Sequence, residues 1–254
     1  MLRKATELRG ITITATDGAI GETEEFYFDD QAWVVRYLVI KAGNWLNRHH
    51  VLIAPQAVKE LDWANHQLLV NLTKEQVINS PDIDTQKPVS RQHEAALADY
   101  YGYPYYWRFP FLVGDPFYPS GIEVIEPVMT KEEIEAARKI EEQSYDPHLR
   151  SVHEVTGYHL GAVDGELGHV EDFIIDEANW AIRYLVVDTR NWLPGEHVLI
   201  APSWIERVSW EESKVFVNLT QEAIKQSHRY EAAALTREYE TELHNYYDKP
   251  YYWS

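Results

Sequence analysis

Apolar and polar residues alternate in several short stretches of the chain, which is the pattern of half-buried β-strands. Residues 11–28 contain two such stretches, separated by the turn pair Asp17-Gly18. WVVRYLVIK at 33–41 and VLIAP at 51–55 are rich in β-branched or aromatic residues and too short for buried helices. The pattern therefore predicts short strands joined by turns.

Helical patterns come later in the chain. Thr73 and Gln76 have the spacing of a capping box, and Thr220 stands at the same place before QEAIKQS. Farther on, apolar residues recur at helical spacing at Ala232, Leu235, Tyr239 and Leu243. A matching but shorter helix is expected from about His93 to Tyr101.

The chain repeats itself at an offset of 147 residues. The matching blocks are RYLV at 36–39 and 183–186, HVLIAP at 50–55 and 197–202, and NLT at 71–73 and 218–220. Each copy ends in a ring-rich tail, YYGYPYYW at 100–107 and YYDKPYYW at 246–253. A unit of about 105 residues thus occurs twice, and an aromatic tail is its last element.

These boundaries predict three parts. Residues 1–107 form the first repeat with its helix and tail, and residues 149–254 form the second. Residues 108–148 form a linker that contains one charged helix, opened by a capping box at Thr130 and Glu133. Its first half is rich in Pro and Gly, which predicts irregular structure. The same half is rich in aromatic residues, which predicts that it packs against a repeat.

Composition narrows the range of partners. The 254 residues carry a formal net charge of −18, which would repel nucleic-acid phosphates and anionic lipid headgroups. No stretch has the apolar length of a spanning helix, and no apolar segment follows the first residues as a secretory signal would. We therefore expect a cytoplasmic protein without nucleic-acid binding or direct membrane insertion.

The succession of motifs in each repeat resembles a known family. An acidic strand of the form G-x-h-x-[DE]-F-x-h-D is followed by W-x-[VI]-R-Y-L-V, then by N-W-L and VLIAP. This succession is similar to the PRC-barrel family, which includes the cytoplasmic domain of the photosynthetic reaction-centre H subunit and the C-terminal domain of RimM. The resemblance implies a mainly β protein of two tandem small antiparallel β-barrels with short peripheral helices.

The family also supplies functional expectations. In both named members the barrel docks on a larger partner and performs no chemistry itself. The resemblance therefore implies a non-enzymatic interaction or scaffold protein that binds a protein partner or self-associates, with the repeats forming an intramolecular pseudo-dimer. Two alternatives stay open: an accessory subunit of a membrane electron-transfer complex, and a small-molecule or metal sensor.

Structural roles are expected for three pairs of repeated residues, which are Arg36 and Arg183, Asp29 and Asp176, and Trp33 and Trp180. The arginines lie in strands whose hairpin partners include Glu24 and Glu25 or Glu171 and Asp172. Cross-strand ion pairs with these acids are the expected contacts. The tryptophans are expected in the cores or as lids over the barrel ends, because large rings are usually buried.

An interaction surface is expected among the remaining rings. The candidates are Trp45, Trp192, Tyr103, Tyr105, Trp107, Tyr251 and Trp253. Tyr and Trp have a flat apolar body with a polar edge or tip, which suits a surface buried against another domain. We also expect each tail to pack on a barrel, and packing on that of the sister repeat would produce the intramolecular pseudo-dimer.

Catalytic signals are weak. The chain has no cysteine and no G-x-S-x-G, P-loop or G-x-G-x-x-G motif, so neither an enzyme nor a cofactor is predicted. Histidines are the best metal ligands available, but only His50 and His197 recur between the repeats, and no ligand spacing accompanies them. No metal site is therefore predicted.

Overall fold

A computed structural model describes residues 1–42, 50–81, 89, 91–106, 149–189, 197–232 and 235–253. The chain divides into two compact units, which are treated separately below. The N-terminal unit is Arg9–Arg150, and the C-terminal unit combines Met1–Leu8 with Ser151–Ser254. Within the described residues, no helix is long and apolar enough to cross a membrane.

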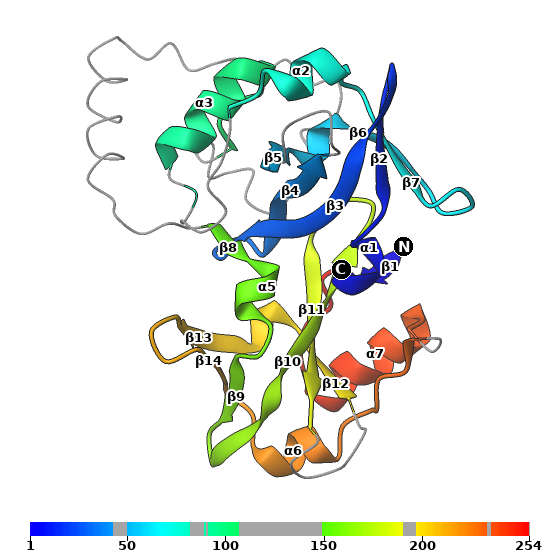
Figure 1. Ribbon diagram of the computed structural model, residues 1–254. Helices are drawn as coiled ribbons and strands as arrows, with labels where there is room; N and C mark the ends of the chain where they lie inside the picture. The colour runs from blue at the N-terminus through cyan, green and yellow to red at the C-terminus, as the bar shows by residue number, and fades with distance from the viewer. Residues whose placement is uncertain are drawn as a thin grey trace. The chain divides into compact units, whose positions relative to one another are not determined.

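The N-terminal unit is built on one sheet. Its strands are β2 (Thr12–Ala15), β3 (Gly18–Asp29), β4 (Val34–Ala42), β5 (His50–Ile53), β6 (Val58–Asp62), β7 (Gln67–Val70) and β8 (Leu149–Ser151). They follow the order β5-β4-β3-β2-β7-β6, with β8 paired to β3 (Figure 1). The helices are η2 (Pro55–Ala57), α2 (Lys74–Ile78) and α3 (Arg91–Tyr101).

The C-terminal unit repeats this plan. Its strands are β1 (Leu2–Lys4), β9 (His159–Ala162), β10 (Gly165–Asp176), β11 (Ile182–Asp188), β12 (His197–Ile200), β13 (Ile205–Ser209) and β14 (Lys214–Val217). Their order is β12-β11-β10-β9-β14-β13, with β1 paired to β10. The helices are α1 (Ala5–Leu8), α5 (Val152–Val155), η5 (Pro202–Trp204), α6 (Gln221–Lys225) and α7 (Arg237–Tyr246).

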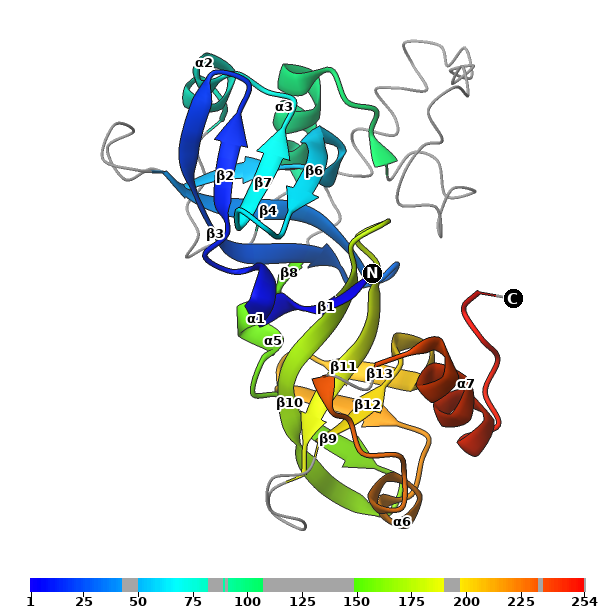
Figure 2. The ribbon, with the colours of Figure 1, turned by 90° about the vertical axis from the view of Figure 1, so that its right-hand side faces the viewer.

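The mainly β class and the repeat of the elements are confirmed, but the expectation of a wholly antiparallel sheet is wrong. β2 pairs in parallel with β7 (Figure 2). β9 pairs in parallel with β14 in the same way. Each seven-stranded sheet is a path of six strands with the seventh paired off it, and the path does not close within the described residues. The parallel pair arises because β7 reaches β2 by a crossover instead of a hairpin.

The first strand of each repeat pairs with the sheet of the other repeat. β1 pairs antiparallel with β10, and Arg3 Nε lies 2.8 Å from Glu177 Oε1. β8 pairs with β3, and Arg150 Nε lies 2.9 Å from Asp30 Oδ2. Both strands begin with Leu-Arg, and both acids follow the same strand end, so the same kind of ion pair forms in each sheet. The compact units therefore differ at this segment from the repeats read along the sequence.

The cores form where the strands present apolar residues inward. Fully buried side chains of the N-terminal unit include Phe26, Phe28, Leu38, Ile40, Leu52 and Ile53. Their counterparts Phe173, Ile175, Leu185, Val187, Leu199 and Ile200 are equally buried. The strongest apolar runs of the sequence thus became the central strands, as expected from burial of apolar surface.

The helix predictions are partly correct. Thr73 forms the capping box with Gln76, and the Thr220 side chain accepts from the Ala223 amide. α7 begins at Arg237 with Thr236 as its N-cap, so Ala232 and Leu235 precede it and the predicted start is wrong. α3 has 11 residues and α7 has 10, so the expectation that α3 is shorter is also wrong.

Candidate functional sites

One tyrosine of each aromatic tail is held between a strand arginine and a helix glutamate. In the C-terminal unit, Arg183 Cζ lies 4.1 Å from the centre of the Tyr252 ring, and the Tyr252 hydroxyl donates to Glu240 Oε1 at 2.7 Å. This arrangement joins β11, α7 and the tail. It combines a cation–π contact with a charge-assisted hydrogen bond.

The N-terminal unit repeats this clamp. Arg36 Cζ lies 4.0 Å from the centre of the Tyr106 ring, and the Tyr106 hydroxyl donates to Glu94 at 2.5 Å. Glu94 is as thoroughly buried as Glu240. Each tail therefore contacts its own unit through this clamp. The pseudo-dimer of repeats stays a prediction.

The predicted ion-pair partners of the two arginines are wrong. Arg36 Nη2 lies 3.4 Å from Asp29 Oδ2, and Arg183 Nη2 lies 3.2 Å from Asp176 Oδ2. The cause is a register shift at the end of the hairpin, where Tyr27 faces Tyr37 but Phe28 faces Val35. Arg36 therefore has no directly opposite residue and turns to the acid at the hairpin end.

The same aspartates hold the turn that carries the predicted tryptophans. Asp29 Oδ1 accepts from the amides of Gln31 and Ala32 at 2.9 and 3.1 Å. Trp33 then adopts a φ of 54° and Trp180 a φ of 58°, a backbone conformation that bulky residues rarely occupy. Trp180 is buried, and Trp33 stacks on Phe28 with ring centres 5.2 Å apart. This environment fits the structural role expected for both pairs.

Glu240 is the centre of a buried polar network in the C-terminal unit. It also accepts from the Tyr184 hydroxyl at 3.0 Å, and that hydroxyl lies 2.9 Å from His244 Nε2. Burial, followed by the charge of Glu240, raises the pKa of Tyr184. Burial also lowers the pKa of His244, whose counterpart in the first repeat is Ala98. The network therefore favours a neutral phenol and a neutral imidazole.

The outer rings of the C-terminal tail form a half-exposed stack. Tyr251 and Trp253 lie 4.9 Å apart with ring planes at 17°, and Arg237 Cζ lies 4.0 Å from the centre of the Trp253 ring. The Tyr251 hydroxyl donates to Asn245 at 2.6 Å. Both predicted rings therefore lie on one surface, beside a guanidinium group that the sequence analysis did not select.

The N-terminal tail differs in its outer rings. Tyr103 stacks on Tyr101 and packs against the buried cluster that contains Leu97, which gives it a partly structural role. The Tyr105 hydroxyl donates to Asp99, the counterpart of the Tyr251 contact. Trp45, Trp107, Trp192 and the linker 108–148 lie outside the described residues.

No protein-family model matches the chain, and no curated protein matches it. The sites are therefore interpreted from their own geometry.

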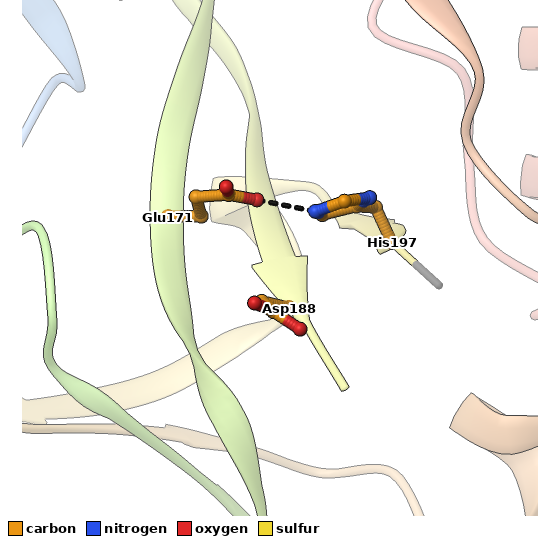
Figure 3. A group of neighbouring side chains, drawn as sticks. All are labelled: Glu171, Asp188 and His197. Carbon is orange, nitrogen blue, oxygen red and sulfur yellow. Dashed lines mark ion pairs between the residues drawn. The ribbon is translucent and has the colours of Figure 1, made fainter. Parts of the chain in front are cut away.

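A second site lies on the three strands β10, β11 and β12. Figure 3 shows Glu171 and His197 facing each other, with Asp188 on the strand between them. One ligand atom from each of the three lies within 4.8 Å of the others. His197 Nε2 and Glu171 Oε2 form an ion pair and are shielded from solvent, and Asp188 is completely buried. The recurrence of His197 was evident in the sequence, but its grouping with Glu171 and Asp188 was not predicted.

The site residues that were not predicted can be recognised by comparing equivalent positions of the two repeats. Glu94 and Glu240 match between the repeats, as do Tyr106 and Tyr252, although none stood out from the many acids and rings around them. Asp188 carries the opposite signal, because the first repeat has Lys41 at that position. Comparison of the repeats position by position could have selected both groups.

Proposed function

We propose that the chain consists of two PRC-type barrel modules and acts as a non-enzymatic interaction or scaffold protein. Its contact surface is the outer face of the C-terminal tail, formed by Arg237, Tyr251 and Trp253. The observation that carries the proposal is that neighbouring rings of the tail make different contacts. All three rings are partly buried, but Tyr252 is fixed inside the clamp by Arg183 and Glu240, whereas Tyr251 and Trp253 stack on each other and the Tyr251 hydroxyl bond is exposed.

Two physical arguments support this surface. Trp, Tyr and Arg are the residues most enriched among those that dominate binding energy in protein interfaces. The stack is also ordered before binding, because Arg237 and Asn245 of α7 hold Trp253 and Tyr251 in place. A preformed surface loses less side-chain freedom when a partner binds.

Charge indicates the kind of partner. A chain with a net charge of −18 attracts proteins with a basic rim and repels acidic ones. The partner that fits is therefore a protein with an apolar contact patch surrounded by Lys and Arg. Weakening of the complex at high salt would reflect this rim.

The test is affinity capture with the full chain as bait in extracts from its own source. Wild type is compared with Tyr251→Ala/Trp253→Ala, and Val163→Ala serves as the control because its side chain is 58% exposed and it follows β9, outside α7 and the tail. A stoichiometric protein retained by wild type and the control but lost from the double variant supports the proposal. Equal retention by all three baits, or no stoichiometric protein, refutes it.

A further inference from the structure

We propose that Glu171, Asp188 and His197 form a binding site for one divalent cation of the zinc class. The proposal uses the strand face of the C-terminal unit and does not depend on the interaction surface of the tail. It starts from the register of the sheet, which brings the three side chains together from three neighbouring strands.

The pairing of the strands explains the convergence. Asp188 on β11 lies directly opposite His197 on β12, so their side chains share one face. Glu171 stands at a register shift of β10, between Val170 and Asp172. A bulge of this kind turns a side chain away from the regular alternation. Glu171 is thereby aimed at His197, with which it forms an ion pair.

Asp188 is held firmly in this position. Gly168 on β10 has a φ of +67°, and a Cβ there would lie 2.0 Å from the Asp188 carbonyl oxygen. Only glycine permits this close approach of the two strands. The Asp188 side chain is fully buried, and His169 Nε2 lies 3.9 Å from its Oδ2. The carboxylate is therefore a preorganised ligand flanked by imidazoles.

The first repeat has an ammonium group at the position that Asp188 occupies in the proposed cation site. Its equivalent residues are Glu24, Lys41 and His50, with Glu24 2.8 Å from His50 Nε2 and 3.9 Å from Lys41 Nζ. The glutamate and the histidine are common to both groups, so the change from Lys41 to Asp188 makes the group of the second repeat more negative by two charges. The second repeat thus replaces an ammonium group of the first with a carboxylate. A bound dication would restore the balance.

The ligand types select the cation. Imidazole nitrogen with carboxylate oxygen suits zinc and its neighbours, whereas calcium and magnesium prefer oxygen ligands throughout. Donors around a tetrahedral zinc ion lie roughly 3.4 Å apart at the usual bond lengths. The three donor atoms lie within 4.8 Å of one another, so small side-chain rotations would complete this geometry. A fourth position would stay open for water or for a further ligand.

The experiment uses the full chain after treatment with a chelator. Isothermal titration with Zn²⁺ measures affinity and stoichiometry, and titration with Co²⁺ reports ligand geometry through its visible absorption. One equivalent is expected to bind with the intense absorption of tetrahedral cobalt. His197→Ala and Glu171→Gln are each expected to lower the affinity by roughly tenfold or more. Glu171 is partly exposed, so its variant is expected to fold.

The matched control is His50→Ala, which removes the equivalent imidazole from the first repeat. This variant is expected to keep the affinity, the stoichiometry and the cobalt spectrum of wild type. The proposal is refuted if wild type binds no Zn²⁺ more tightly than His197→Ala does. It is also refuted if His50→Ala lowers the affinity as much, because general binding to an acidic surface would then explain the signal.

Discussion

Tyr252→Phe tests the clamp by removing one oxygen atom. The hydroxyl donates to Glu240 at 2.7 Å, and Glu240 is only 3% exposed. A hydrogen bond to a charged group contributes roughly 1.5–3 kcal/mol. Glu240 keeps its contacts with Tyr184 and Arg237, so we expect a loss of about 2 kcal/mol, near the lower end of this range. The Phe ring can still stack under Arg183, which isolates the hydrogen bond from the packing.

Hydrogen–deuterium exchange measured by mass spectrometry can follow α7 and α3 as separate peptides. A loss of about 2 kcal/mol corresponds to roughly 30-fold faster exchange in α7, because each 1.4 kcal/mol is a factor of ten. Tyr106→Phe should produce the same effect in α3 and leave α7 unchanged. Tyr251→Phe is the control, since its exposed hydroxyl contributes about 0.5 kcal/mol. Exchange in α7 that changes no more in Tyr252→Phe than in Tyr251→Phe would refute the reasoning.

Two further predictions concern stability. Burial raises the pKa of both Tyr230 and Tyr247 to about 12, against an unfolded value of about 10. Because the folded state favours the neutral phenol, this stabilisation is complete below pH ~10 and is lost as pH rises from ~10 to ~12. The urea midpoint should fall across that window, and a constant midpoint would contradict the expectation. Leu8→Ala should cost about 2–5 kcal/mol and should speed exchange in β10, because α1 packs on β10. Faster hydrogen–deuterium exchange confined to β2 and β3 would contradict the assignment of residues 1–8 to the C-terminal unit.

The sequence predicted the elements of the fold well, because strong local signals specified them. The Asp17-Gly18 turn, the apolar strands and the Thr73 cap all depend on neighbouring residues. The pairing of β1 and β8 with the sheet of the other repeat was not predictable in this way. Leu2-Arg3 and Leu149-Arg150 match, so these two residues alone do not indicate which sheet each strand joins. The parallel pairing of β2 with β7 likewise depends on tertiary packing.

The candidate sites were predicted less completely for a similar reason. The register shift that separates Tyr27 from Phe28 redirected Arg36 to Asp29, and simple counting along a hairpin does not include such shifts. Tyr252 could not be distinguished from Tyr251 in the sequence, because the contacts that clamp the Tyr252 ring come from Arg183 and Glu240 on distant elements. The grouping of Glu171 with Asp188 and His197 has the same origin.

The central claim is that the outer rings of the C-terminal tail contact a partner while the inner ring belongs to the fold. A photo-reactive phenylalanine analogue placed at Trp253, and in a second sample at Tyr252, tests it directly in cells of the native source. The account predicts that position 253 cross-links to one partner protein, whereas position 252 yields only products with the mass of the single chain. Cross-links to the same protein from both positions, or to no protein from position 253, would contradict the claim.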